Sequence, residues 1–377
     1  MKHNFRGIGM MSGSSLDGLD LACVEFIRGR NQWKYKIICA ETRRYPPVWK
    51  EKLSTLGKKP AAVFAHAHVE YGHFLGEEAN KFIRRHHLHP QFIASHGHTV
   101  FHQPHKGFTF QIGDGAALMA ETGLPVVADF RSADVARGGQ GAPLVPFGEQ
   151  KLFVRNSNEA QGFLNLGGIA NISFHYKNRV AAFDVCPCNL ILNELALLAG
   201  KQEGFDRDGR LARKGNIHLP LLRELNRLAY YKKSHPKSLG REWFEQKFRP
   251  VFVRYRAPVR DKLSTAVEHI SQQITRACNA LLPPHHNKAV LLITGGGAKN
   301  RFLFHSLEKK ISPLNIQVSK NTSSVTVDYK EALIFAFLGL CRLRGEINTL
   351  ASVTGAEKDS SGGAVYIPPR HTHNFFA

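Results

Sequence analysis

The stretch GMMSGSSLDGLD, residues 9–20, follows a short apolar start and precedes a second apolar run, Leu21 to Ile27. Apolar segments on both sides of a glycine- and serine-rich turn predict a β-hairpin. Glycine amides and serine hydroxyls can hold phosphate oxygens, and a carboxylate in the same loop can hold Mg²⁺ through water. The turn is therefore either a phosphate site or an ordinary hairpin turn, and the rest of the chain bears on the choice.

The length and composition favour a large globular protein. At 377 residues the chain has room for two domains, or for one large domain with a cleft between lobes. No apolar run approaches the ~20 residues needed to cross a bilayer, and the start MKHNFRGIGM lacks the apolar core of a secretion signal. The six cysteines are scattered, with only Cys186 and Cys188 close together, which favours free thiols in the cytoplasm.

The chain is strongly basic, with 51 Lys and Arg against 30 Asp and Glu and a formal net charge of +21. Such a charge permits binding of nucleic acids or anionic ligands, but no paired CxxC or aromatic RNA-binding stretch accompanies it. We therefore expect a solvated basic surface, with neither nucleic acid nor a membrane as partner.

Further polar loops follow apolar strands. The run Phe92–Ser95 opens into HGHTVFHQP, whose three histidines lack cysteine or carboxylate partners at metal-binding spacing, so we expect them to hydrogen-bond or pack. Later, GFLNLGGIANISF repeats the strand–turn–strand pattern, Asp184 ends a strand, and AVLLIT runs into Gly295–Gly297. The repeated pattern predicts two lobes built on the same plan.

The organisation between these loops is less sharply marked. The segment from Gly138 to Phe153 is rich in glycine and proline, and we expect the chain to cross between lobes there. Apolar residues at helical spacing predict a long helix over Phe64–Leu88. The pattern Thr265-x-x-Glu268 is a capping box, which predicts that a helix begins at Thr265.

The order of the glycine loops matters more than any one of them. Walker A and protein-kinase signatures are absent. The stretches GMMSGSSLDGLD, ASHGHTVFHQP, QIGDGAALMAETGLPVVADFRSADVARGGQGAPLVP, FLNLGGIANISF, PKSLGREWF, LITGGGAKN, EALIFA and SVTGA resemble the anhydro-N-acetylmuramic acid kinase family over nearly the whole chain. One loop departs from the family: FDVCPCN stands where about FDTGPGN is usual, and Ser14 replaces a common Thr.

The resemblance implies an α/β fold of the two-lobed, actin-like (ribonuclease H-like) ATPase type, with a nucleotide cleft between the lobes. The first lobe would take residues 1–145, joined by the tail at about 360–377, and the second lobe residues 146–359. It also implies ATP and Mg²⁺ as cofactors and a small sugar as substrate. A homodimer is possible.

The resemblance also implies site residues. Asp184 would be the catalytic base, and Asp17 an outer-shell Mg²⁺ ligand. The nucleotide would contact Ser12, Gly13, Ser14, Ser15, Asp17, Gly18, Gly167, Gly168, Asn171, Gly295, Gly296 and Gly297. The sugar would contact His96, Thr99, Arg131 and Glu331, with Arg131 pairing with the lactyl carboxylate.

The implied reaction opens the 1,6-anhydro bridge of anhydro-N-acetylmuramic acid with water and phosphorylates O6. It gives N-acetylmuramic acid 6-phosphate and ADP in the cytoplasm, during peptidoglycan recycling. The alternative is an actin-like ATP-binding module without sugar kinase activity. Because the polar loops form a complete set for substrate chemistry, we favour the enzyme.

Overall fold

The computed structural model describes residues 4–13, 16, 18–29, 32–154, 159–177, 179–283, 288–319 and 324–369. The chain divides into two compact units, one of residues 1–154 and 324–377 and the other of residues 155–323. From the sequence we expected residues 324–359 in the second lobe, whereas residues from 324 onward group with the first unit. No helix among the described residues is long and apolar enough to cross a membrane.

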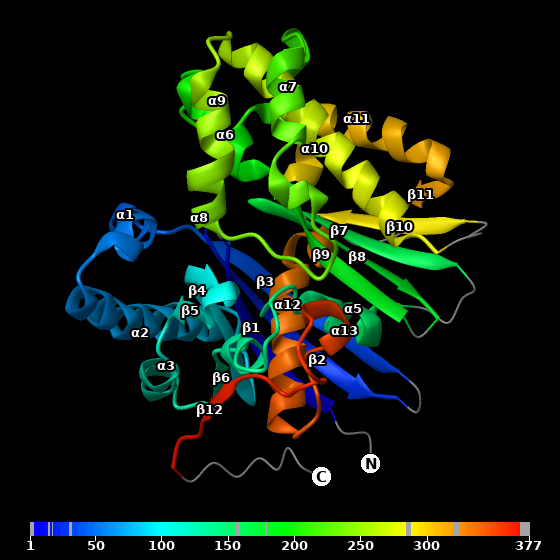
Figure 1. The fold of residues 1–377 in the computed structure, drawn as a ribbon. Coiled ribbons are helices and arrows are strands. Elements are labelled where there is room, and N and C mark those ends of the chain that lie inside the picture. The colour runs from blue at the N-terminus through cyan, green and yellow to red at the C-terminus, as the bar shows by residue number, and fades with distance from the viewer. Residues whose placement is uncertain are drawn as a thin grey trace. The chain divides into compact units, whose positions relative to one another are not determined.

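The first unit holds a mixed sheet with helices on both faces (Figure 1). Its strands are β1 (Asn4–Ser12), β2 (Leu19–Arg28), β3 (Trp33–Arg43), β4 (Phe92–Gln103), β5 (Phe108–Ile112), β6 (Val126–Ala128) and β12 (Ala364–Tyr366). Its helices are α1 (Pro47–Thr55), α2 (Ala61–Arg85), α3 (Gly115–Thr122), α4 (Ser132–Val135), α5 (Val145–Leu152), α12 (Ser324–Leu343) and α13 (Ala351–Thr354). Among the described residues the sheet order is β12-β6-β4-β1-β2-β3, and β5 pairs with β4.

Alternation along β1 builds a core on each face of this sheet. Phe5 and Met11 pack with the buried apolar residues of α12, whereas Ile8 and Met10 pack with residues of α1 and α2. The helix α12 follows the whole second unit in sequence, yet its residues 332–338 are fully buried in the first core. Because α12 is buried against this sheet, it is part of the first unit.

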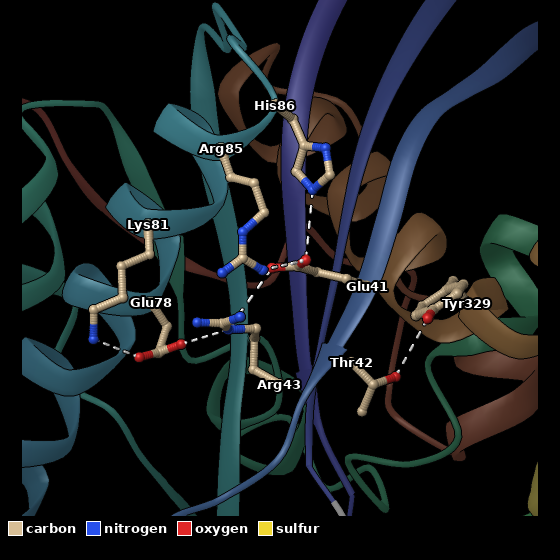
Figure 2. Close-up of polar contacts among 8 residues, drawn as sticks. All are labelled: Glu41, Thr42, Arg43, Glu78, Lys81, Arg85, His86 and Tyr329. Carbon is tan, nitrogen blue, oxygen red and sulfur yellow. Dashed lines mark hydrogen bonds and ion pairs between the residues drawn. The ribbon is translucent and has the colours of Figure 1, made fainter.

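Charged residues tie β3 to the end of α2 (Figure 2). Arg43 Nε lies 2.8 Å from Glu78 Oε2, and Arg85 NH1 lies 3.0 Å from Glu41 Oε2. Lys81 and His86 extend these two pairs on the helix side, as Figure 2 shows. The edge of the sheet is thereby held to the helix by ion pairs as well as by apolar packing.

The second unit holds a smaller sheet. Its strands are β7 (Ala160–Leu166), β8 (Ile169–Tyr176), β9 (Arg179–Pro187), β10 (Ala289–Thr294) and β11 (Ile316–Val318). Its helices are α6 (Asn189–Leu198), α7 (Leu219–Asn226), α8 (Arg241–Trp243), α9 (Arg249–Arg254), α10 (Val259–Leu281) and α11 (Arg301–Ile311). One apolar core joins its strands to the helices α6 and α10. The helix α10 begins at Val259 after Pro258, so the start expected at Thr265 is wrong; the Thr265 hydroxyl donates to the Asp261 carbonyl inside the helix.

The two sheets share one topology. In the first, β1, β2 and β3 form an antiparallel meander, β4 is parallel to β1, and β6 is parallel to β4. In the second, β7, β8 and β9 form the meander, β10 is parallel to β7, and β11 is parallel to β10. This repeated order confirms the predicted duplicated α/β fold of the actin-like type. The nucleotide cleft expected between the lobes stays a prediction.

Candidate active site

The loop between β1 and β2 carries the first group of sequence-predicted residues. Ser12 ends β1, and Gly13 and Gly18 lie on either side of Leu16, whose amide donates to the Gly13 carbonyl at 3.3 Å. Ser14, Ser15 and Asp17 lie outside the described residues. The proposed Mg²⁺ ligand is therefore among the residues of which the structure gives no account.

Ser12 lies within a buried chain of hydrogen bonds. The Tyr45 hydroxyl donates to Ser12 Oγ at 2.6 Å, and the Tyr71 hydroxyl lies 2.6 Å from that of Tyr45. Because the single proton of Tyr45 goes to Ser12, Tyr71 donates to Tyr45. Burial raises the pKa of Tyr71 to about 12, so it keeps its proton. His98 Nδ1 lies 2.8 Å from Ser12 Oγ, so this hydroxyl is bonded on two sides inside the unit.

A bulge in β4 directs His96 and His98 to different partners. Gly97 between them has φ of +69°, and a side chain there would lie 2.4 Å from the Ile112 carbonyl oxygen. The β1–β4 pairing shifts register at this point. His98 therefore meets Ser12, while the His96 ring packs on Phe335 of α12 at 4.7 Å between ring centres.

His96 and Arg131 form the centre of the candidate sugar site. Arg131 donates to His96 Nε2 from Nε at 3.0 Å and from NH2 at 2.9 Å. His96 Nδ1 therefore carries the proton and donates to the Gly97 carbonyl at 2.9 Å. Burial, together with the Arg131 charge, holds the pKa of His96 well below its usual value, so the ring is neutral.

Glu331 lies close enough to Arg131 for their charges to interact. Burial raises the pKa of Glu331, whereas the charges of Lys330 and Arg131 lower it. The structure thus brings His96, Arg131 and Glu331 together. Thr99, farther along β4, pairs with Gln111 of β5. His96, His98 and His102 form hydrogen bonds, and the His96 ring also packs on Phe335. The described part of the chain contains no group of three or more side chains that could bind a metal ion.

In the second unit the Gly167–Gly168 turn lies against the start of α6. The Gly168 carbonyl accepts the amide of Cys188 at 2.8 Å, and the Gly167 carbonyl accepts that of Asn189 at 3.1 Å. In a trans peptide the next amide points away from the carbonyl. The N–H groups of Gly168 and Ile169 therefore point away from α6. In that direction they can donate hydrogen bonds to an anion.

The Gly295–Gly297 turn lies beside the end of β7. Gly295 has φ of +84°, and a side chain there would lie 2.4 Å from Asn165 Oδ1. The space beside Gly297 is limited by Leu166 in the same way, and Asn189 Nδ2 donates to the Leu166 carbonyl at 2.9 Å. Since β7 and β10 are parallel neighbours, both glycine turns lie at the carboxyl ends of their strands, where α/β sheets bind ligands.

Asp184 ends a row of polar residues across three strands. Asn165 of β7 pairs with Asn171 of β8, and Asn171 pairs with Asp184 of β9. Directly opposite residues share a face of the sheet, and their neighbours in sequence point into the helical core on the other face. The sequence-predicted Asn171 and Asp184 therefore lie side by side.

Asp184 is held from a second segment. Its Oδ2 accepts the Leu239 amide at 2.8 Å, and its own amide donates to the Lys237 carbonyl at 3.3 Å. The Tyr230 hydroxyl donates to the Asp184 carbonyl, and burial followed by the Asp184 charge raises the pKa of Tyr230. With 8% of its surface exposed, Asp184 is a fixed and nearly buried carboxylate.

Comparison with known proteins finds a family whose model covers nearly the whole chain. The model of the anhydro-N-acetylmuramic acid kinase family matches residues 5–368. The chain belongs to this family. An anhydro-N-acetylmuramic acid kinase of Haemophilus influenzae is 35% identical, covering 95% of this chain and 97% of that protein. One of Pasteurella multocida is 37% identical, covering 95% and 96%.

The loop FDVCPCN, in which cysteines stand where the sequence comparison expected glycines, does not use positive φ at either cysteine. Neither Cys186 nor Cys188 has positive φ, and Cys188 has φ of −122°. Both thiols are fully buried in the core, and burial raises the pKa of Cys188 to about 12. The two cysteines therefore pack as small apolar residues beside Asp184.

Several residues of the arrangement were not singled out from the sequence. Asn165 precedes the Gly167–Gly168 turn within the quoted stretch FLNLGG, and Leu239 lies in PKSLGREWF, to which no role was given. Their positions in family-like stretches are the only signal in the sequence. Tyr230 carried no signal, because its role depends on a contact formed only in the folded unit.

Proposed function

We propose that this protein is an ATP-dependent kinase that opens the 1,6-anhydro ring of anhydro-N-acetylmuramic acid and phosphorylates O6. The products are N-acetylmuramic acid 6-phosphate and ADP, and the role is peptidoglycan recycling. The observation that carries this proposal is the fixed Asp184 in the row with Asn165 and Asn171, beside two glycine turns, in a chain of this family.

The chemistry assigns a task to each group. A water oxygen bonds to C1 as the C1–O6 bond breaks, and O6 bonds to the γ-phosphorus as the bond to the ADP oxygen breaks. Asp184 accepts the proton that the water loses. The Leu239 amide orients its carboxylate, and the Tyr230 hydroxyl fixes the peptide behind it.

The phosphates are assigned to backbone and hydroxyl donors. In the first unit these are the loop from Ser12 to Gly18, and in the second the turns Gly167–Gly168 and Gly295–Gly297. Mg²⁺, held through Asp17 and water, would neutralise charge on the transferred phosphoryl group. We place the reaction in the cytoplasm, and we propose a homodimer as the assembly.

For the sugar we propose Arg131 as the partner of the lactyl carboxylate, with His96, Thr99 and Glu331 around it. The guanidinium is a planar fork suited to carboxylate. The neutral His96 accepts hydrogen bonds from Nε and NH2, on one edge of the guanidinium. These two bonds fix the plane of the guanidinium, and so the directions of its remaining N–H groups.

The test is ADP release with and without the sugar, for the wild type and Asp184→Asn. Substitution keeps the shape but removes the proton acceptor, so we expect kcat to fall by about 10²–10⁴ while the Kd for ATP stays within a few fold. Asp206→Asn is the matched control, because Asp206 also accepts backbone amides in the second unit. ADP release that the sugar does not change would favour an actin-like ATP-binding module instead.

A further inference from the structure

A buried carboxylate in the first unit has no part in the proposed chemistry. Asp134 of α4 is 1% exposed, and its Oδ1 accepts the hydroxyl of Thr354 of α13 at 2.7 Å. Its Oδ2 accepts the amide of Gly141 at 2.7 Å. Two segments 220 residues apart thus meet at one side chain.

The contact continues to the candidate sugar site. The amide of Gly141 is bound by Asp134, and its carbonyl accepts from Arg131 NH1 at 2.7 Å. The Gln140 amide donates to the Thr354 carbonyl at 2.8 Å, which holds the same loop to α13. Gly141 therefore cannot shift without disturbing both the buried carboxylate and the guanidinium.

Three N–H groups of Arg131 have fixed acceptors through this arrangement. NH1 donates to the Gly141 carbonyl, and Nε and NH2 donate to His96 Nε2. A guanidinium recognises a carboxylate by a planar, two-point contact, so its plane must be correct as well as its charge. Of the two acceptors, only the Gly141 carbonyl depends on a loop, and that loop depends on Asp134 and Thr354.

We propose that Asp134 and Thr354 are positioning residues for Arg131, and that they set the preference for a sugar that carries a carboxylate. This inference rests on the proposed function, because it takes the lactyl carboxylate as the partner of Arg131. It also gives a role to the stretches ARGGQG and SVTGA, which the reaction itself leaves without one.

The test compares two ligands, anhydro-N-acetylmuramic acid and its lactyl methyl ester, which lacks the negative charge and carries one added methyl group. Dissociation constants are measured by calorimetry for the wild type and for Thr354→Val, Thr354→Ser and Asp134→Asn. Thr122→Val is the control, because in the same unit the Thr122 hydroxyl donates to the Leu118 carbonyl of its own helix and accepts the Leu124 amide.

Thr354→Val should weaken binding of the acid about tenfold to a hundredfold, the loss expected for a hydrogen bond to a charged group. Binding of the ester and of ATP should change less than threefold. Thr354→Ser keeps the hydroxyl and should restore the affinity for the acid. Asp134→Asn should repeat the loss, with thermal melting used to verify that each variant folds.

Equal weakening of acid and ester would overturn the inference, since it would indicate general damage to the fold. Unchanged binding of both would overturn it as well. A wild type that binds the acid in preference to the ester but does not turn it over would refute the proposed function while supporting the inference. A wild type that binds neither would overturn both.

Discussion

Lys330 and Glu149 form a buried ion pair, and we predict that substituting one or the other shifts the pKa of Glu331 in opposite directions. Lys330 Nζ lies 2.7 Å from Glu149 Oε1, and both side chains are 3% exposed. Removing one partner of such a pair leaves an uncompensated buried charge, which typically costs about 3–5 kcal/mol in the free energy of unfolding. We expect that cost for Lys330→Met and for Glu149→Gln, and a smaller cost for the double variant than for their sum.

The same pair adjusts the pKa of Glu331, the residue next to Lys330. Burial raises this pKa, the Lys330 charge lowers it, and the Glu149 charge raises it by a smaller amount. If ionised Glu331 accepts a hydrogen bond from the sugar, kcat/KM rises with pH through its pKa. Lys330→Met should therefore move the acid limb of the kcat/KM profile to higher pH, and Glu149→Gln should move it to lower pH.

Urea denaturation and pH profiles of the two single variants and the double variant measure both effects. Movement of the two acid limbs in the same direction would refute the role given to Glu331. Costs below about 1 kcal/mol for both single variants would refute the buried pair itself, because only exposed pairs contribute so little.

Other contacts give further predictions. Tyr230→Phe removes the hydroxyl that donates to the Asp184 carbonyl, so kcat should fall about threefold to tenfold with an unchanged Kd for ATP, as steady-state kinetics and calorimetry would show. Gly295→Ala should weaken ATP binding, because the new side chain meets Asn165 at 2.4 Å; Gly200→Ala, at φ of +77° with open space around it, should not. His269 has a pKa of about 3 in the folded state against 6.5 when unfolded, because it is buried. Its contribution to stability is therefore present above pH 6.5 and lost as the pH falls, by about 2 kcal/mol at pH 5, and His269→Gln should flatten the urea-midpoint profile over that range.

The sequence indicated the hairpins and glycine turns because their signals are local. Glycine and serine between apolar runs mark a turn wherever it is, so the turns after Ser12, at Gly167 and at Gly295 were predicted from the local sequence, whereas their phosphate contacts came only from the family resemblance. The Thr265 pattern misled for the same reason, since a local cap signal cannot reveal that Pro258 has already begun the helix.

Long-range packing was beyond such signals. Nothing in the residues of α12 indicates which of two sheets buries them, although the sequence correctly marks them as an apolar helix. The pairing of Asp184 with Asn171 needs the register of β8 against β9, and the Leu239 amide reaches Asp184 across 55 residues. The resemblance to the family singled out Asp184. The contacts that fix its carboxylate and its peptide are visible only in the folded unit.

Phosphorus NMR on a mixture of the protein, ATP, Mg²⁺ and anhydro-N-acetylmuramic acid tests the central claim most directly. The account predicts that the γ-phosphate signal is replaced, one for one, by a phosphate monoester coupled to the two protons on C6, and only when the sugar is present. Inorganic phosphate formed at the same rate with and without the sugar would contradict it.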